Sequence, residues 1–261
     1  MPALSADGTG DKDMTKIAIC GANGKMGHVI ADIISHRDDC ETICGIDKNT
    51  AEYGFPIVSK PQDMPVKPDV IIDFTHPSAL DDLASYCLST NTPIVLATTG
   101  YSEEQTAQIK KMAQQVPVFF TFNMSLGINL LADLAKRAAT VLGDQFDIEI
   151  VEKHHNQKID APSGTAIMLA DAINETLDNS KQYVYDRHSR RQKRDRNEIG
   201  MHSIRGGTIV GEHDIIFAGR DEVITLSHSA TSKEVFAVGA VNAAVFMNGR
   251  PAGLYSMSDI I

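Results

Sequence analysis

A strand, a glycine-rich turn, a helix and a second strand at the start of the chain constrain its fold most strongly. Residues 16–20 form an apolar run typical of a buried parallel strand, and the spacing G-x-x-G-x-x-G follows from Gly21 to Gly27. A helical pattern leads from there to a second apolar run that ends at Asp47. Glycines let the backbone approach a pyrophosphate, a helix N-terminus stabilises its charge, and an acid after the second strand accepts hydrogen bonds from a ribose. This order predicts a dinucleotide-binding βαβ unit.

The alternation of strands and helices continues through the first half of the chain. Strand-like runs follow at residues 69–74, 93–97 and 116–120, with helical patterns between them. Such alternation predicts an α/β fold with a Rossmann-type, doubly wound parallel sheet, whose ligands bind at the carboxyl ends of the strands. Polar residues recur after successive strands, which favours a nicotinamide and ribose site over a set of helix caps. They are Thr75, Thr98, Thr99, Thr121 and Asn123.

The pair Asp47-Lys48 bears on the choice of cofactor. An aspartate suits the free ribose 2′-OH of NAD, whereas a neighbouring lysine can pair with the 2′-phosphate of NADP. The two residues act in opposite directions, so we expect the chain to use both NADH and NADPH.

Residues 152–166, EKHHNQKIDAPSGTA, carry the strongest chemical signal. His154 stands beside His155, and Lys158 follows three residues later. Two other interpretations stay open for the histidines. They could be zinc ligands, although neighbouring residues of a strand point to opposite faces and no third ligand has metal-site spacing. They could also be core histidines satisfied by hydrogen bonds. Lys158 favours an anion site, because a cation beside two imidazoles needs an anion to be stable.

The second part of the same segment predicts the start of a helix. Ser163 is a good N-cap for the apolar-periodic stretch that follows, so the N–H groups of Gly164 and Thr165 would be free to attract an anion. An imidazole supplies a proton donor near neutral pH. Together these features predict a site that holds a small dicarboxylate and protonates it.

The rest of the second half turns from helical to strand-like patterns. Apolar residues recur at helical spacing over residues 126–141, and they alternate with polar residues over 146–152. Further strand-like runs at 201–204, 208–217 and 222–227 are separated by glycine-rich turns. This pattern predicts an α+β domain with an open mixed sheet, whose one apolar face would serve as an oligomer surface.

These patterns divide the chain into an extension and two domains. Residues 1–14 are rich in Gly, Asp and Ser and lack periodicity, which predicts a disordered extension. We assign residues 15–124 to a dinucleotide-binding domain and residues 125–233 to a substrate-binding and oligomerisation domain. An alanine-rich helix is expected at 235–246 and could pack back on the first domain, so residues 234–261 are assigned to it.

Charge and cysteine usage narrow the possible partners. A net charge of −10 argues against nucleic acid and anionic membranes. Residues 187–196 run the other way, with six Lys or Arg and one Asp, and fit either a solvated loop or a basic loop near an anionic substrate or a subunit contact. No membrane-length apolar run or signal peptide is visible, which predicts a cytoplasmic protein, or a plastid protein if the source is a plant. Reduced thiols are expected at Cys20, Cys40, Cys44 and Cys87.

The motifs resemble those of the 4-hydroxy-tetrahydrodipicolinate reductase family of the lysine pathway, formerly called dihydrodipicolinate reductase. The specific part is E-x-H-H-x-x-K-x-D-A-P-S-G-T-A, and the resemblance runs from about residue 16 to near the C-terminus. It implies reduction of a cyclic unsaturated dicarboxylate by NAD(P)H, with loss of water, to 2,3,4,5-tetrahydrodipicolinate. It also implies a homotetramer joined through the second-domain sheets. Shorter matching segments are Gly21 to Gly27, Asp73-Phe74-Thr75, Thr98-Thr99-Gly100, Asn123-Met124-Ser125, and Arg205-Gly206-Gly207 to Gly211-Glu212-His213.

The resemblance implies roles for individual residues and no metal. His154 would be the general acid and Lys158 its catalytic partner. Two departures are that Ala97 replaces a glycine common in the family, and that Asp47-Lys48 differs from the Glu-Arg pair of some members. The expected substrate-binding residues are His155, Ser163, Gly164 and Thr165. The expected cofactor-binding residues are Gly21, Ala22, Asn23, Gly24, Lys25, Met26, Asp47, Lys48, Phe74, Thr75, Ala97, Thr98, Thr99, Thr121, Phe122, Asn123 and Met124.

Two alternative functions remain open at this point. Another NAD(P)-dependent amino-acid oxidoreductase, such as an aspartate dehydrogenase-like enzyme, could share the first domain, but it would not need the His-His-x-x-Lys and Ser-Gly-Thr residues. A non-enzymatic NAD(P)H-sensing regulator would need a DNA-binding or partner module, and the sequence shows no sign of one.

Overall fold

The computed structural model describes residues 14–261, and the chain forms two compact units. The first unit contains the residues up to Thr121 together with Ala237–Ile260, and the second contains Phe122–Phe236 with Ile261. The chain therefore leaves the first unit once and returns to it near its end. Nearly all of the extension predicted at residues 1–14 lies outside the described residues.

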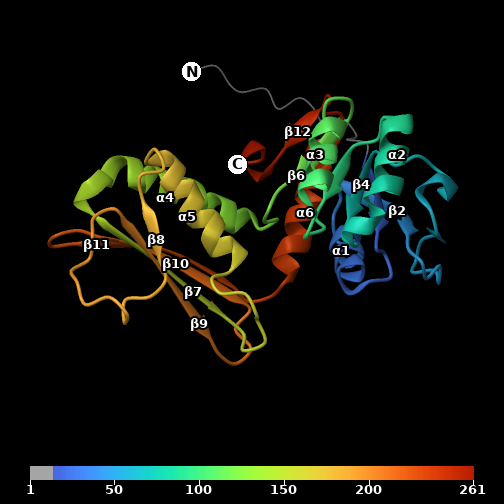
Figure 1. The fold of residues 1–261 in the computed structure, drawn as a ribbon. Coiled ribbons are helices and arrows are strands. Elements are labelled where there is room, and N and C mark those ends of the chain that lie inside the picture. The colour runs from blue at the N-terminus through green and yellow to red at the C-terminus, as the bar shows by residue number, and fades with distance from the viewer. Residues whose placement is uncertain (1–13) are drawn as a thin grey trace, which may run out of the picture. The chain divides into compact units, whose positions relative to one another are not determined.

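The first unit is built on a seven-stranded, fully parallel sheet (Figure 1). Its order is β12-β6-β5-β4-β1-β2-β3, so the first strand lies inside the sheet and the strand order reverses next to it. This confirms the predicted Rossmann-type doubly wound sheet. The strands are β1 (Thr15–Cys20), β2 (Cys40–Ile46), β3 (Ile57–Val58), β4 (Val70–Asp73), β5 (Ile94–Leu96), β6 (Pro117–Phe120) and β12 (Gly253–Tyr255).

Helices of the first unit bury apolar stripes against this sheet. Leu80, Leu83 and Cys87 of α2, with Ile109 and Met112 of α3, share one core with alternate residues of the central strands. Ser102 caps α3 in a capping box with Gln105. The helices are α1 (Lys25–Ser35), α2 (Leu80–Thr90), α3 (Glu103–Met112) and most of α6 (Glu234–Met247), with 3₁₀ turns η1 (Pro61–Asp63), η2 (Pro77–Ala79) and η4 (Met257–Asp259).

The second unit is a mixed five-stranded sheet of order β11-β10-β7-β9-β8. Strand β10 runs antiparallel to β7 and β11, whereas β7, β8 and β9 run parallel. Helices α4 and α5 lie on one face (Figure 1), where Ile150, Phe217 and Leu169 are fully buried. This confirms the predicted open mixed sheet. Its elements are α4 (Leu126–Leu142), η3 (Gly143–Gln145), β7 (Asp147–His154), α5 (Gly164–Thr176), β8 (Gln182–Val184), β9 (Glu198–Arg205), β10 (Gly211–Ala218) and β11 (Val223–Ala230).

Arginines of the basic segment at residues 187–196 bind residues of the sheet of the second unit. Arg194 donates to Glu149 at 2.8 Å and to Asp147 at 2.9 Å, and it also donates to the carbonyl oxygens of Ile148 and Glu198. Arg187 donates to the Glu198 carboxylate at 2.6 Å. At least two of its cations therefore neutralise carboxylates of the sheet, a contact that the sequence did not predict.

Among the described residues, no helix combines the length and the apolar character that crossing a bilayer requires.

Candidate functional site

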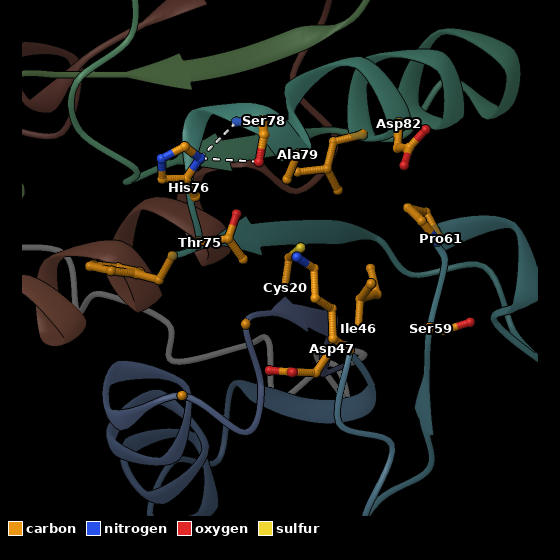
Figure 2. Close-up of a pocket in the computed structure, with 15 residues that line it drawn as sticks. Cys20, Ile46, Asp47, Ser59, Pro61, Thr75, His76, Ser78, Ala79 and Asp82 are labelled. Atoms are coloured by element: carbon orange, nitrogen blue, oxygen red, sulfur yellow. Dashed lines mark hydrogen bonds between the residues drawn. The ribbon is translucent and has the colours of Figure 1, made fainter.

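A pocket of about 510 Å³ lies at the carboxyl ends of the strands of the first unit. The turn after β1, the end of β2 and the segment from β4 into α2 enclose it. Figure 2 shows Ser78 and Asp82 on one side and Asp47 on the other. A doubly wound sheet binds its ligand at this edge, and the volume falls within the range of cofactor sites.

The turn between β1 and α1 depends on glycine at two positions. Gly21 has a φ of +85°, and a Cβ there would stand 2.8 Å from the carbonyl oxygen of Phe74. A Cβ on Gly27 would stand 2.1 Å from the carbonyl oxygen of Gly21. Side chains at these positions would push the turn away from its neighbours, so only glycine leaves a backbone cradle that a pyrophosphate can approach. The residues present therefore fit a dinucleotide.

Asp47 ties this turn to the loop after β2. One carboxylate oxygen accepts a hydrogen bond from the backbone N–H of Asn23 at 3.0 Å, and the other accepts from Asn49 at 3.0 Å. The Asn23 amide in turn donates to the carbonyl oxygens of Asn49 and Ala51. Each Asp47 oxygen has a second lone pair that can accept from a ribose hydroxyl. Lys48 lines the same pocket.

Asp73 is a buried carboxyl group, 1% exposed, at the end of β4. It accepts hydrogen bonds from the Thr75 hydroxyl at 2.5 Å and from the Tyr101 hydroxyl at 3.2 Å. Burial raises the pKa of Asp73 and also that of the neighbouring Cys20 thiol. The backbone N–H of Thr75 donates to the Thr98 hydroxyl oxygen at 2.9 Å. These contacts fix Thr75 where it lines the pocket.

Some of the predicted cofactor residues line the pocket, and others do not. The predicted residues that line it are Gly21, Gly24, Asp47, Lys48, Phe74 and Thr75. The predicted residues that do not line it are Ala22, Asn23, Lys25, Met26, Ala97, Thr98, Thr99 and Thr121 of the first unit, and Phe122, Asn123 and Met124 of the second. Lining residues that sequence reasoning missed are Cys20, Ile46, Ser59, Pro61, His76, Ser78, Ala79, Asp82 and Leu83.

His154 ends β7 in the second unit, and its side chain is nearly buried. Its Nδ1 lies 2.6 Å from a carboxylate oxygen of Glu152, two residues earlier on the same face of the strand. Its Nε2 would lie 3.2 Å from a Cβ built on Gly211, so the glycine leaves room for the ring. Among the described residues, the ring is thus held through Nδ1, and Nε2 has no hydrogen-bond partner.

Glu152 is the centre of this site; the sequence analysis includes it in the motif but assigns it no role. It is 1% exposed, and Arg205 donates to both of its carboxylate oxygens, at 2.7 and 2.8 Å. Burial acts to raise the pKa of Glu152, but its interactions with Arg205, Ser203 and His154 outweigh it and lower the pKa to about 2. The carboxylate is therefore ionised at neutral pH and accepts hydrogen bonds only.

The N-terminus of α5 meets the same carboxylate. Ser163 donates its backbone N–H to Glu152 at 3.1 Å, and its hydroxyl oxygen caps α5 by accepting from Ala166 at 3.1 Å, which confirms the predicted N-cap. Thr165 accepts from the Asn123 side-chain amide at 3.0 Å. Among the described residues, no atom outside the adjoining chain lies within 4 Å of a Cβ built on Gly164, so this helix start is accessible to an anion.

His155 and Lys158 form a turn between β7 and α5. The backbone N–H of Lys158 donates to the carbonyl oxygen of His155 at 3.1 Å. The Lys158 ammonium pairs with Asp160 at 2.9 Å, and this pair lowers the pKa of the Asp160 carboxyl group. Arg205 also donates to the Asp160 carbonyl oxygen, at 2.6 Å, and so fastens this turn to β9. The turn thus places a cation in the segment between His154 and α5.

His213 of β10 is a second buried histidine that sequence reasoning missed as a site residue. Its Nε2 lies 3.1 Å from the Ser163 hydroxyl, and its ring meets that of His154 edge to face with centroids 5.3 Å apart. Burial, and then the neighbouring His154, lower the pKa of His213 to about 4.

Residues 14–261 contain no group of three or more His, Cys, Asp or Glu side chains arranged to hold a metal ion.

Comparison with known proteins identifies relatives over nearly the whole chain. A family model described as dihydrodipicolinate reductase, N-terminus, matches residues 15–124, and one described as dihydrodipicolinate reductase, C-terminus, matches residues 127–261. The 4-hydroxy-tetrahydrodipicolinate reductase of Caldanaerobacter subterraneus subsp. tengcongensis is 50% identical over 248 residues, which cover 95% of this chain and 98% of the relative. The protein of the same name from Clostridium tetani is 47% identical over 249 residues, 95% of this chain and 97% of the relative.

Solved structures give the same picture at lower identity. A dipicolinate-bound dihydrodipicolinate reductase from Paenisporosarcina sp. TG-14 superposes with a TM-score of 0.79 at 27% identity and covers 95% of this chain and all of that one. Aspartate dehydrogenase from Thermotoga maritima superposes with a TM-score of 0.51 at 9% identity, covering 91% of this chain and 98% of that one. The second likeness concerns the fold alone.

Proposed function

The chain belongs to the dihydrodipicolinate reductase family, and we propose that its two units divide the work of one reduction. The protein is an oxidoreductase of a nicotinamide-dependent family. It reduces 4-hydroxy-tetrahydrodipicolinate to 2,3,4,5-tetrahydrodipicolinate with loss of water, a step of lysine and diaminopimelate biosynthesis. Relatives of that name, 47–50% identical over 95% of the chain, support this assignment.

The observation that carries the proposal is the shared carboxylate of Glu152. One of its oxygens lies 2.6 Å from His154, and the other accepts from the backbone of Ser163 at the N-terminus of α5. A proton donor and an anion-binding helix start are thereby joined through one buried group. This is the pairing needed to hold a dicarboxylate and protonate it.

In the proposed mechanism the second unit binds and protonates the substrate. His154 delivers the proton, and the Lys158 ammonium supports that transfer by offsetting the substrate's negative charge. His155, Ser163, Gly164 and Thr165 hold the substrate carboxylates. Asp160 pairs with Lys158 before the substrate arrives, and a substrate carboxylate replaces it.

The first unit would hold the reduced nicotinamide cofactor, which supplies the hydride. The cradle at Gly21 and Gly27, where no Cβ can be placed, supports pyrophosphate binding. Asp47 and Lys48 support use of both NADH and NADPH, because one favours a free ribose hydroxyl and the other a phosphate. We propose Ala22, Asn23, Gly24, Lys25 and Met26 for the same turn, and Phe74, Thr75, Ala97, Thr98, Thr99 and Thr121 for the ribose and nicotinamide. Phe122, Asn123 and Met124 of the second unit stay predicted cofactor residues, and no metal is expected to take part.

We further propose the organisation that the family resemblance implies. Residues 15–124 and 234–261 form the dinucleotide-binding domain, and residues 125–233 form the substrate-binding and oligomerisation domain. The protein is a homotetramer in the cytoplasm, joined through its mixed sheets, with a small dicarboxylate as its partner and no nucleic acid or membrane.

A coupled assay tests the function. A dihydrodipicolinate synthase generates the substrate in place, and oxidation of NADH or NADPH is followed by absorbance. We expect oxidation that requires both the synthase and this chain, and that His154→Gln suppresses. An aspartate dehydrogenase-like enzyme would instead oxidise the cofactor with oxaloacetate and ammonia. A cofactor-sensing regulator would bind NADPH without turnover.

A further inference from the structure

We infer that Glu152 is a positioning residue for the reduction, which fixes the ring of His154 so that Nε2 faces the substrate. The inference rests on the proposed role of His154 as the general acid. It adds a residue that acts through His154 and does not itself touch the substrate.

The contacts of Glu152 leave its carboxylate no freedom to turn. One oxygen lies 2.6 Å from His154 Nδ1 and accepts from Arg205 at 2.8 Å. The other accepts from Ser163 at 3.1 Å and from Arg205 at 2.7 Å. Two donors thus converge on each oxygen of a side chain that is 1% exposed.

An ionised carboxylate determines which nitrogen of His154 carries the hydrogen. Because Glu152 can only accept, the nitrogen that faces it must be an N–H donor. In the neutral ring the hydrogen therefore lies on Nδ1 and the lone pair on Nε2. In the protonated ring the second hydrogen lies on Nε2, on the side where Gly211 leaves room, and it is the one available for transfer.

Charged and titratable groups from other elements surround the pair. Arg205 comes from the end of β9, and His213 comes from β10 with its ring against that of His154. Lys158 lies in the turn between β7 and α5. Among these neighbours Arg205 neutralises Glu152, so the carboxylate can orient the histidine without leaving an unpaired buried charge.

Glu152 also couples the histidine to the anion-binding helix start. Its second oxygen holds the backbone of Ser163, the residue that caps α5. A shift of the carboxylate would therefore move the proton donor relative to the substrate carboxylates. Catalysis is sensitive to displacements of this kind, because the reacting atoms must be aligned before proton transfer.

The matched control lies on the opposite face of the same strand. Glu149 binds Arg194 at 2.8 Å and His202 at 2.7 Å, which repeats the combination of arginine, glutamate and histidine away from Glu152. The two glutamates are three residues apart on β7 and so point to opposite faces. Glu149→Gln should lower the free energy of unfolding without lowering kcat, when variant and wild type are compared in the same oligomeric state.

The test is a double-mutant cycle with Glu152→Gln and His154→Gln. A glutamine has one acceptor oxygen where four hydrogen bonds now converge on two, so the ring loses its fixed orientation. We expect Glu152→Gln to lower kcat by about 10²-fold, within the range of a general acid, while KM for the substrate and the Kd for NADH change less than threefold. In the His154→Gln background the same change should cost less than about threefold in kcat, because its partner is gone.

The outcomes separate this inference from the proposed function. Absence of coupled turnover in the wild type would contradict the proposed function itself, whereas near-normal turnover of His154→Gln would contradict the role of His154 as general acid. If His154→Gln loses most of its kcat but Glu152→Gln keeps a kcat within twofold of wild type, the inference alone is overturned. Additive losses in the double variant would overturn it as well, since Glu152 would then act independently of His154.

A measurement on the unchanged protein covers the case in which Glu152→Gln fails to fold. Nitrogen chemical shifts of the histidine side chains, with His154 assigned by its loss in His154→Gln, report which nitrogen is protonated in the neutral ring. We expect hydrogen on Nδ1. A neutral ring with its hydrogen on Nε2 would overturn the inference.

Discussion

The hydroxyl of Ser163 lies 3.1 Å from Nε2 of His213, and both side chains are buried. Within the described residues His213 Nδ1 has no hydrogen-bond partner. A hydrogen on Nδ1 would leave a buried donor unpaired, at a cost of about 1–3 kcal/mol. The neutral ring therefore carries its hydrogen on Nε2 and donates it to Ser163. That hydroxyl also accepts from Ala166, so its own hydrogen is left for another acceptor, such as a substrate carboxylate.

His213 should make the protein less stable as the pH falls. Its pKa in the folded protein is about 4, below the ordinary 6.5, because burial and then His154 disfavour its charged form. Between these values the unfolded chain binds the proton and the folded chain does not, so stability is lost as the pH falls from about 6.5 to about 4. The loss for this group reaches about 3 kcal/mol. Urea unfolding at several pH values should show it in the wild type and not in His213→Gln, and equal pH dependence would contradict it.

Lys158→Ala should reduce kcat by about 10²–10⁴-fold, the range for a group that supports proton transfer. The Kd for NADPH should be nearly unchanged, because the first unit carries the cofactor pocket. Lys153→Ala is the control, since Lys153 pairs with Glu212 and Asp214. We expect this variant to keep the turnover of the wild type. Steady-state kinetics decide the matter, and near-normal turnover of Lys158→Ala would remove the lysine from the mechanism.

His154→Gln should lower kcat more than His155→Gln does. His154 is bonded to Glu152 and lies against Gly211, whereas His155 is the first residue after β7. We expect His155→Gln to act mainly on KM for the substrate. Equal changes in both kinetic constants for the two variants would leave no division of roles.

Cofactor preference should be modest, within about tenfold to thirtyfold, and sensitive to salt. A charge pair near the surface contributes about 1 kcal/mol or less, and 1.4 kcal/mol corresponds to about tenfold in affinity. Lys48→Ala should weaken NADPH use and leave NADH use almost unchanged. KM values for both cofactors at low and high ionic strength test this. A preference above about a thousandfold, or equal effects of Lys48→Ala on both cofactors, would locate selectivity in other residues.

Arg194→Ala should destabilise the second unit by about 1–3 kcal/mol, because its side chain, 17% exposed, donates to two carboxylates and three carbonyl oxygens. Arg191 lies in the same basic segment and is exposed, so Arg191→Ala should change stability by no more than about 0.5 kcal/mol. The free energy of urea unfolding compares the two variants. Equal effects would mean that the segment acts only through its overall charge.

Local patterns allowed most of the fold to be predicted. The period-2 and period-3.6 spacing of apolar residues identified the long strands and helices, and the N-cap at Ser163 followed from residue type alone. The strands β3, β8 and β12, which have only two or three residues, were not predicted. The strand predicted from residue 208 begins at Gly211, because the turn around Gly207, with a φ of +48°, extends further than expected.

The centre of the second-unit site was harder to predict. Arg205 reaches Glu152 only because β9 pairs with β7 in a register that sets Arg205 opposite His154, and pairing between distant strands leaves no local signal. His213 arrives in the same way through β10. One signal was present, however. Glu152 shares the parity of Ile148 and Ile150, and an acid on the buried face of a strand indicates a paired or functional carboxylate.

The return of the chain to the first unit at Ala237 affects the order in which the protein can be completed during synthesis. The sheet edge at β6 is covered by β12, and Asn248 bonds back to Thr15 of the first strand at 3.2 Å. A ribosome makes residues 122–236 of the second unit before it makes either segment. During that interval β6 presents an uncovered row of backbone groups, the kind of edge that recruits strands from other chains. Strand β12 thus completes the sheet and also ends the period in which β6 could pair with another chain.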